Sequence, residues 1–386
     1  MAKIKSVEVC VARVPLDSPV SFSTRTVLAR EYCLVRITAD DGTAGIGYSY
    51  AVNKGGRLLA LSVLDLFGPK LIGEESTRVE GIWRDLYHDV LLLGRAGAIM
   101  RALSAVDIAL WDLNARCAKL PLYQYLGAVS LDSVAAYASG GYYWPGKSND
   151  MLASEFGRYA SEGFKAVKMK TGRLSVSEEA ARVAAVREAI GPDTLLMLDA
   201  NNAWRDMPEA MLYMRRLEKY EPFWIEEPFS PDDIDNHARL SRATSVPVAT
   251  GEIEAGRWRF KDLLSREATT LMQVDATVCG GISEWRKVAA TCSAYEVSVA
   301  PHAWHDVHIH LVASTANATY VEFMPDDHIV NFRRLIDRQI VAEQGRLVLP
   351  REPGLGFDFD DDAVAKYGVP QAGHSGVWMR SDASDG

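Results

Sequence analysis

The sequence is poor in the features that mark secreted, membrane-spanning or nucleic-acid-binding proteins. Its 386 residues include five cysteines with no Cys-x-x-Cys pair among them, which argues against a disulfide framework or a zinc site built on thiolates. No apolar run approaches the roughly 18 residues of a membrane-spanning helix. The net charge is −9, so nucleic acid is not an expected partner, and an anionic ligand would need a locally cationic site. The sequence therefore predicts a cytoplasmic protein that acts on a small molecule.

The first third of the chain has the pattern of a small α+β domain. Residues 1–45 alternate apolar and polar side chains, as strands do and as a signal peptide does not, and Asp41-Gly42 marks a turn. Between Leu58 and Leu126 the apolar residues recur every three or four positions, which is the period of amphipathic helices. We therefore expect an α+β domain over residues 1–130.

From residue 131 onward, short apolar runs alternate with helical segments. Eight such units predict a parallel sheet with right-handed crossovers, closed into a (β/α)8 barrel. The expected barrel spans residues 131–347, and the irregular tail, residues 348–386, is expected to pack back on the first domain. The runs are VAAYAS (134–139), AVKMK (166–170), LLMLDAN (195–201), FWIEEP (223–228), VPVATGE (246–252), LMQVDA (271–276), VSVAPH (297–302) and YVEF (320–323).

Most of these predicted strands end in a side chain that is capable of chemistry. In a parallel barrel the carboxyl ends of all strands meet at one mouth, where active sites lie. Residues that follow one another at intervals of 20 to 31 positions in the sequence are therefore expected to converge. They are Lys168 and Lys170, then Asp199, Glu226, Glu252, Asp275, His302 and Glu322.

Asp199, Glu226 and Glu252 end consecutive strands and form a predicted metal site. Carboxylates 4 Å apart repel by about 4 kcal/mol per pair at an effective dielectric constant of 20, so such a cluster needs protons or a cation. Ligands that are all oxygen favour Mg²⁺ over zinc. Glu227, beside Glu226, stays open as the alternative ligand.

Two bases are predicted on opposite sides of this metal. Lys168 and Lys170 point to the same face of their strand, and neighbouring buried ammonium groups lower each other's pKa, although Lys168 could instead only bind a carboxylate. Asp275 and His302 end adjacent strands, and such a pair fixes the imidazole tautomer and raises its basicity. A metal between two bases suits removal of a proton α to a carboxylate.

Four histidines fall within PHAWHDVHIHL, residues 301–311. His302 ends a strand and is the catalytic candidate, whereas the other three belong to the helix that should follow. Trp304 and His305 are expected to line the pocket, with simple packing as the alternative for His305. His308 and His310 are expected to be buried structural residues, because no thiolate or acid cluster nearby completes a zinc site.

The ordered strand motifs resemble those of the enolase superfamily, specifically its mandelate racemase subgroup. The matching motifs are VKMK, LDAN, IEEP, TGE, VDA, PH and VE on strands two to eight, with the helix SAVDIALWDL and PGLG near the end. One such motif is weak, but seven in order at family-like spacing are specific, and they cover nearly the whole chain. The resemblance implies a modified (β/α)8 TIM barrel with an α+β capping domain formed by the N-terminal region and the C-terminal tail.

The resemblance also implies a role for each residue at a strand end. Three carboxylates bind the metal, two bases flank the substrate, and further groups hold the substrate carboxylate. The implied assignment is Mg²⁺ on Asp199, Glu226 and Glu252, Lys170 as one base with Lys168 as its modulator and carboxylate partner, the His302–Asp275 dyad as the other base, Glu322 as a protonated hydrogen-bond donor to the substrate, and Asn201 as a lining residue.

Chemistry in this subgroup starts with removal of one α-proton and then diverges. Loss of a β-hydroxyl makes a dehydratase, return of the proton makes a racemase or epimerase, and loss of a ring oxygen makes a cycloisomerase. We expect a sugar-acid dehydratase, since most members with these residues are of that kind. A barrel that has lost catalysis would lack a base or a ligand, and a zinc hydrolase would need histidines on the early strands.

Substrate specificity is expected from loops of the first domain and from the loop after the first barrel strand. Polar, aromatic and cationic side chains there suit a hydroxylated anion, although each could equally pack between domains. A homo-oligomer is expected because the two domains of such proteins often present large shared faces. The candidate substrate-binding residues are Arg25, Tyr48, Tyr50 and Lys54, with Ser23, Tyr142 and Trp144 as further ones.

Overall fold

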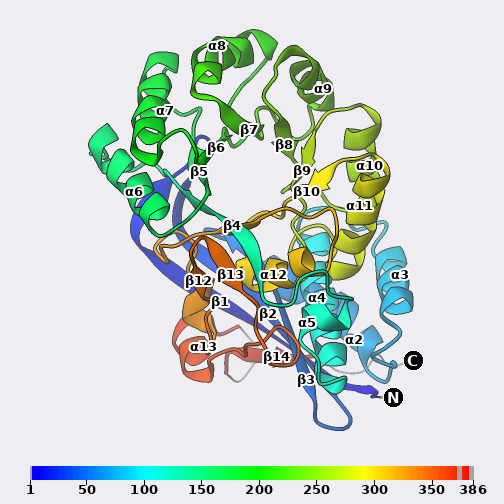
Figure 1. Ribbon diagram of the computed structural model, residues 1–386. Coiled ribbons are helices and arrows are strands. Elements are labelled where there is room, and N and C mark those ends of the chain that lie inside the picture. The colour runs from blue at the N-terminus through cyan, green and yellow to red at the C-terminus, as the bar shows by residue number, and fades with distance from the viewer. Residues whose placement is uncertain (1, 372–375, 382–386) are drawn as a thin grey trace.

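A four-stranded antiparallel sheet forms the N-terminal part of the computed structural model, which describes residues 2–371 and 376–381 (Figure 1). The order of its strands is β14-β1-β2-β3. Strands β1, β2 and β3 confirm the antiparallel strands that the alternating sequence pattern predicted, whereas β14 comes from the tail. Its strands are β1 (Ile4–Ser21), β2 (Thr26–Ala39), β3 (Ala44–Val52) and β14 (Trp378–Arg380).

Helix α4 packs directly on the β3 side of this sheet. Two glycines of β3 allow the close approach: a Cβ atom on Gly45 would lie 2.3 Å from the carbonyl oxygen of Ala109, and one on Gly47 would lie 2.2 Å from that of Ala105. The helical segments of this part are α1 (Gly56–Leu61), the π-helical turn η1 (Ser62–Phe67), α2 (Gly68–Leu71), α3 (Val79–Asp89), α4 (Ala98–Cys117) and α5 (Leu122–Tyr125).

Eight parallel strands form the barrel. Each strand pairs with the next from β4 to β10, and β11 pairs back with β4. A bridge between Val299 and Ala318 joins β10 to the segment before β11 and completes the ring. The strands are β4 (Ser133–Gly140), β5 (Ala166–Lys170), β6 (Leu195–Asp199), β7 (Pro222–Glu226), β8 (Val248–Thr250), β9 (Leu271–Met272), β10 (Ser298–Val299) and β11 (Val321–Phe323).

Helices connect the successive strands, and Figure 1 shows α6 to α11 as a ring outside β5 to β10. In the described part of the chain, β11 is followed by a short 3-10 helix, η3 (Phe332–Leu335), instead of an eighth covering α-helix. The connecting helices are α6 (Asn149–Ser161), α7 (Val176–Ile190), α8 (Met207–Leu217) with the 3-10 turn η2 (Glu218–Tyr220), α9 (Ile234–Ala243), α10 (Arg257–Ser265), α11 (Ile282–Ala294) and α12 (His305–Ala313). The modified (β/α)8 fold class is confirmed.

The C-terminal segment returns to the first sheet. Helix α13 (Asp361–Tyr367) contacts β1, and β14 pairs antiparallel with β1. The hairpin of β12 (Ala342–Glu343) and β13 (Arg346–Val348) extends the barrel sheet at β4, so the predicted boundary at residues 347/348 falls inside a strand. The domain limits 1–130, 131–347 and 348–386 stay predictions. None of the helices in the described ranges has the length and apolar character needed to cross a membrane.

Large side chains fill the interior of the barrel. Tyr137, Met197 and Trp224 are fully buried there and belong to one apolar cluster. The indole N–H of Trp224 donates to Glu226 Oε2 at 3.0 Å. The apolar cluster therefore closes the barrel beneath the polar residues at its mouth.

Candidate active site

Three carboxylates from adjacent strands meet at the barrel mouth. Asp199 ends β6, Glu226 ends β7 and Glu252 lies two residues after β8, and one oxygen of each lies within 4.8 Å of the others. The first two are fully buried and Glu252 is 9% exposed. Burial, together with the charge of Asp199, raises the pKa of Glu226 to about 8. The structure thus holds closely spaced acids whose repulsion a divalent cation would relieve.

The surroundings of the cluster fit Mg²⁺. Every donor is a carboxylate oxygen, which a hard cation prefers, and the three ligands come from three strand ends. Glu252 Oε2 is buried without a hydrogen-bond partner among the described residues, as a ligand atom would be before it meets its cation. The residues therefore suit a hard divalent cation, which would have further coordination positions for water and substrate.

Glu227 follows Glu226 but is not one of the three acids whose oxygens lie within 4.8 Å of one another. Its backbone is left-handed, with φ of 43°, and its side chain is buried and lines the adjacent cavity. Burial and then the charges of Glu252 and Asp199 raise its pKa well above the usual value. The geometry favours Glu226 over Glu227 as the third ligand, and the assignment of the ligand stays a prediction.

Two lysines of β5 lie against the acids. Lys168 Nζ is 2.5 Å from Glu226 Oε1 and 3.0 Å from Glu322 Oε1, and Lys170 Nζ is 2.5 Å from Asp199 Oδ2. Lys170 lines the cavity and Lys168 is not among the lining residues. Lys170 is thus the lysine in a position to reach a ligand.

The expected lowering of the lysine pKa values is wrong for this arrangement of side chains. Burial and the neighbouring Lys168 do lower the pKa of Lys170, but Asp199, Tyr142 and Glu322 together raise it above the usual value, with Asp199 the largest of the three. Burial lowers the pKa of Lys168 too, but Glu226 and Glu322, with Tyr137 and Asp199, together raise it above the usual value. The contacting acids, rather than ammonium repulsion, dominate here.

His302 and Asp275 form the predicted dyad. His302 Nδ1 donates to Asp275 Oδ2 at 3.0 Å, which leaves Nε2 toward the cavity, 3.5 Å from Glu252 Oε1. The other oxygen of Asp275 accepts from the backbone N–H and the hydroxyl of Thr277, both at 2.7 Å. Burial lowers the pKa of His302, but Glu252 and the Asp275 hydrogen bond raise it to about 9 overall. Both carboxylates thus favour the imidazolium form of His302.

Glu322 differs from the expectation of a protonated acid. It is fully buried on β11, and its Oε2 accepts from the backbone N–H of Ala303 at 2.7 Å. Burial raises its pKa, but Lys168 and then His302 lower it below the usual range. The structure therefore favours an ionised Glu322, which forms an ion pair with Lys168 and accepts the hydrogen bond from the backbone N–H of Ala303.

The remaining histidines of the motif lie on α12, as predicted. His305 is buried against Phe323 at 4.9 Å between ring centroids and is not among the residues that line the cavity, which favours the packing alternative. His308 and His310 are fully buried, in agreement with the structural role expected of them. His308 lies close to the dyad, because its Nε2 is 3.6 Å from Asp275 Oδ1.

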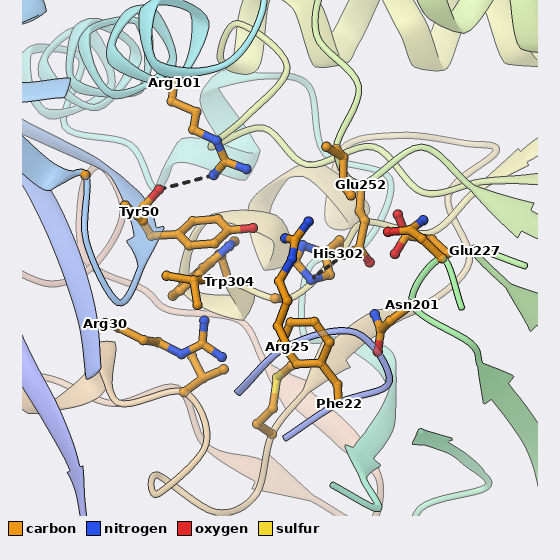
Figure 2. Close-up of a pocket in the computed structure, with 18 of the residues that line it drawn as sticks. Phe22, Arg25, Arg30, Tyr50, Arg101, Asn201, Glu227, Glu252, His302 and Trp304 are labelled. Carbon is orange, nitrogen blue, oxygen red and sulfur yellow. Dashed lines mark hydrogen bonds and ion pairs between the residues drawn. The ribbon is translucent and has the colours of Figure 1, made fainter. Parts of the chain in front are cut away.

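A cavity of about 330 Å³ opens beside the acids and the two bases. Figure 2 shows Glu227 and Glu252 on one side, His302 in the middle, and Tyr50, Trp304 and two arginines on the other side. Among the predicted substrate-binding residues, those that line it are Arg25, Tyr50, Tyr142, Asn201 and Trp304, and those that do not are Ser23, Tyr48, Lys54, Trp144 and His305.

The predicted residues outside the cavity have other surroundings. Tyr48 is buried and stacks on Phe332 at 3.7 Å, with its edge toward Trp304, so it supports a wall residue. Lys54 is exposed. Ser23 donates to the carbonyl of Thr171 and so docks the loop before β2 on the barrel.

Left-handed backbone recurs where the strands end. Asn201, Glu227, Ala303 and Trp304 have φ values of 44°, 43°, 48° and 36°, a region that costs energy for residues other than glycine. All four line the cavity. Strained backbone therefore turns these four residues toward the cavity.

Sequence reasoning missed two arginines that line the cavity, Arg30 and Arg101. Arg30 lies in β2 and is 6% exposed, and Arg101 lies in the first turns of α4. One signal was available for Arg30, which is a charged residue inside an otherwise apolar strand pattern. No local signal distinguishes Arg101 from an ordinary helix-surface arginine.

Comparison with known proteins places this geometry in a family. The family model described as "Enolase C-terminal domain-like" matches residues 151–363, and the one described as "Mandelate racemase / muconate lactonizing enzyme, N-terminal domain" matches residues 4–127. The chain is 33% identical over 368 residues to a 3,6-anhydro-alpha-L-galactonate cycloisomerase of Streptomyces coelicolor, covering 95% of this chain and 99% of the relative. It is 32% identical over 369 residues to an L-talarate/galactarate dehydratase of Salmonella typhimurium, covering 94% and 90%.

A solved structure is similar over nearly the whole length. The L-talarate dehydratase of Polaromonas sp. JS666, complexed with Mg and L-glucarate, has a TM-score of 0.89 at 28% identity, covering 98% of this chain and 99% of that chain. Its bound magnesium agrees with the predicted cofactor. The matches confirm the resemblance that the strand motifs indicated, and the chain belongs to the mandelate racemase/muconate lactonizing enzyme family of the enolase superfamily.

Proposed function

We propose that the protein removes the α-proton of a sugar acid in a Mg²⁺-dependent reaction and then eliminates the β-hydroxyl as water, giving a 2-keto-3-deoxy acid. One observation carries the proposal. Lys170 and the His302–Asp275 dyad come from strands on opposite sides of the barrel, line or adjoin one cavity, and flank the three-carboxylate cluster. Two proton-transferring groups beside an anion-stabilising site are what this chemistry needs.

Asp199, Glu226 and Glu252 would hold the metal. When bound, it supplies positive charge that stabilises the negative charge developing on the substrate carboxylate as the α-proton leaves. Trp224 keeps one oxygen of Glu226 in place through its indole N–H. Asn201 donates its backbone N–H to Asp199 Oδ1 at 2.9 Å and so orients that carboxylate.

Lys170 would accept the α-proton. Its Nζ is at the cavity wall and its pKa is held high by Asp199, so it releases its own proton more readily once Asp199 is engaged elsewhere. Lys168 lies behind it, paired with Glu226 and Glu322. In this role Lys168 balances the buried acids and positions them.

His302 would give its proton to the leaving hydroxyl. Its Nε2 faces the cavity, and Asp275 stabilises the imidazolium form by accepting from Nδ1, so the proton on Nε2 is the one available for transfer. The C–O bond then breaks with its electron pair on oxygen, water leaves, and the enol product becomes the keto acid. Asp275 keeps the ring oriented throughout, because Nδ1 donates to it.

The test is incubation of the purified protein with Mg²⁺ and a panel of sugar acids in D₂O, followed by NMR and a 2-keto acid assay. A keto product that is lost in Lys170→Ala and in His302→Asn is the expected result. Deuterium at the α-carbon without a keto product would mean a racemase or epimerase, and ring opening of a lactone or anhydro acid would mean a cycloisomerase. Conversion that persists in both variants would overturn the assignment of the two bases.

We infer further that the protein is cytoplasmic and forms a homo-oligomer. All five cysteines are unpaired and four are buried, which suits a reducing compartment. Three successive leucines follow α3, and the middle one, Leu92, is fully exposed. An apolar side chain presented in this way favours contact with a second copy of the chain.

A further inference from the structure

Arg30 is a buried cation that lacks an acidic partner. Four lysine and arginine residues are buried in the described part of the chain, and the other three, Lys168, Lys170 and Arg182, each form an ion pair. Arg30 is 6% exposed and forms none within the described ranges. A buried charge without a counter-charge is costly, so this position calls for an anion from outside the chain.

The contacts of Arg30 hold its guanidinium in place but do not neutralise it. Its Nε donates to the carbonyl of Ile329 at 2.9 Å, and the guanidinium lies 5.9 Å from the centre of the Trp304 ring. The hydrogen bond uses the Nε edge of the guanidinium, and the contact with Trp304 uses one of its faces. The two terminal nitrogens are left for a ligand in the cavity, which Arg30 lines.

Arg101 gives the same side of the cavity a second positive charge. Its Nη1 donates to the carbonyl of Tyr50 at 3.2 Å, and its guanidinium lies 4.6 Å from the centre of the Tyr50 ring. It forms no ion pair with any residue that the structure describes. In Figure 2 Arg101 and Arg30 flank Tyr50 and Trp304, so the aromatic pair separates two cations that face one space.

The cavity is therefore polarised along its length. Glu227 and Glu252 lie at one end beside the metal site, His302 lies in the middle, and the two arginines lie at the other end (Figure 2). The first carboxylate of a sugar acid belongs at the metal end, because its α-carbon must meet Lys170 and His302. The opposite end of the same molecule then reaches the arginines.

We infer that the substrate is a dicarboxylic sugar acid whose distal carboxylate binds Arg30, while Arg101 adds positive charge to the same end of the cavity. A planar guanidinium binds a carboxylate through two parallel hydrogen bonds. A terminal hydroxymethyl group has no negative charge and would not neutralise Arg30. Such a site rejects an analogue that lacks the expected anion, because the buried cation is then desolvated and unpaired. This inference rests on the proposed function, since it names the substrate class of the same site.

The experiment compares each hexaric acid with the hexonic acid of the same configuration, with Mg²⁺ present. The two acids differ only in the terminal group, so the ratio of their kcat/KM values reports the distal subsite. We expect the diacid to be favoured by at least about 10- to 100-fold, which is the range for a hydrogen-bonded charge. Arg30→Met should lower kcat/KM for the diacid by about the same factor without lowering that for the hexonic acid, and Arg30→Lys should restore part of the loss.

Arg36→Met is the matched control. Arg36 lies on the same strand, pairs with Asp361 and is remote from the cavity lining, so its loss should leave the substrate ratio unchanged. A wild-type preference for the hexonic acid, or for a hexonic acid that carries a terminal phosphate, would overturn the inference. So would an equal loss for both acids in Arg30→Met.

Binding measured by calorimetry separates this inference from the proposed function. If no acid of either kind is turned over or exchanges its α-proton, the proposed function fails. The distal subsite is still tested in that case by the affinities of the Mg²⁺-loaded protein for the paired acids. Tighter binding of the diacid that is lost in Arg30→Met would support the subsite, and equal affinities would overturn it.

Discussion

The imidazole of His308 accepts a hydrogen bond from the backbone N–H of Ala276 at 3.0 Å. Its other nitrogen, Nδ1, donates to the carbonyl of Ala303 at 2.8 Å. Ala276 follows Asp275 and Ala303 follows His302, so one neutral ring joins the two strand ends that carry the dyad. Burial lowers the pKa of His308, which keeps Nε2 unprotonated and able to accept.

His308 should therefore be a positioning residue. We expect His308→Leu to lower kcat by about 10- to 100-fold, a range typical when a group that orients a catalytic residue is removed, with KM nearly unchanged because His308 does not line the cavity. His237→Leu is the control, since His237 on α9 is also buried and its Nδ1 bonds the backbone carbonyl of Asp233, which precedes that helix. A similar fall of kcat in both variants would show that the effect is only loss of packing.

Removal of Mg²⁺ should abolish activity, and its return should restore it. Because the native state alone presents the three carboxylates together, Mg²⁺ at 100 times its Kd should stabilise the fold by about 2.7 kcal/mol, which a thermal melt detects. Glu226→Gln should lose this rise in Tm and Glu227→Gln should keep it. The reverse result would make Glu227 the ligand, and full activity with chelator present would contradict the metal site.

Gly47→Ala should destabilise the protein by about 1–3 kcal/mol, the usual cost of forcing extra atoms into a packed core. The added Cβ would meet the Ala105 carbonyl oxygen at 2.2 Å, so α4 must move away from β3. Gly157→Ala is the matched control, because its Cβ would meet nothing within 4 Å in α6 and should stabilise the helix slightly. In urea unfolding, the free energy of unfolding should fall in Gly47→Ala and rise slightly in Gly157→Ala. Equal unfolding midpoints for the two variants would contradict the close packing of α4 on β3.

Protonation of His310 should lower the free energy of unfolding at acidic pH. Its Nδ1 accepts from the backbone N–H of Tyr123 and its Nε2 donates to the carbonyl of Leu355, and burial lowers its pKa from 6.5 to about 4. The unfolded state therefore binds one more proton between these two values, and stability is lost as the pH falls through this window. The full effect is about 3 kcal/mol.

The measurement is the free energy of unfolding in urea between pH 7 and pH 4.5. In His310→Gln the decrease over this range should be smaller than in the wild type by about 2–3 kcal/mol. The exposed His88 provides the control variant His88→Gln, whose curve should follow the wild type. A His310→Gln curve parallel to the wild type would contradict the buried neutral ring.

Leu92→Glu should reduce the oligomer to a smaller species, because a charge in an apolar contact is desolvated without a partner. Light scattering after size exclusion gives the mass. Leu131 is also exposed, at 56%, and lies away from this cluster in the sequence, so Leu131→Glu should leave the mass unchanged. An unaltered mass in Leu92→Glu would exclude these leucines from the interface.

The barrel could be predicted because each strand carries its own local signal. Strand β5 has the limits of the predicted run, 166–170, and the strand ends converge in any closed parallel barrel. Strand β9 is shorter than its predicted run, 271–276, since only Leu271–Met272 pair in the ladder. The residues that follow Met272 leave the sheet and turn Asp275 toward His302.

The distal part of the site could not be predicted because it depends on how the first domain docks. Arg30 reaches the cavity only through the placement of β2 over the barrel mouth, which no periodicity encodes. The pKa of Lys170 was misjudged for a related reason. The direction of the pKa shift depends on the 2.5 Å contact between Lys170 and Asp199. Spacing along the sequence predicts which residues are neighbours, but not the distances between their atoms.

The origin of the cavity walls has an evolutionary consequence. Lys170, His302 and the acid cluster come from the barrel, whereas Arg25, Arg30 and Arg101 come from the first domain and its loops. The loop before β2 is fastened to the barrel through the carbonyls of Thr171 and Asn201, which every amino acid possesses. Mutation can therefore alter which molecules are accepted while the reaction itself is inherited unchanged, and a library confined to the first domain is the economical route to new substrates.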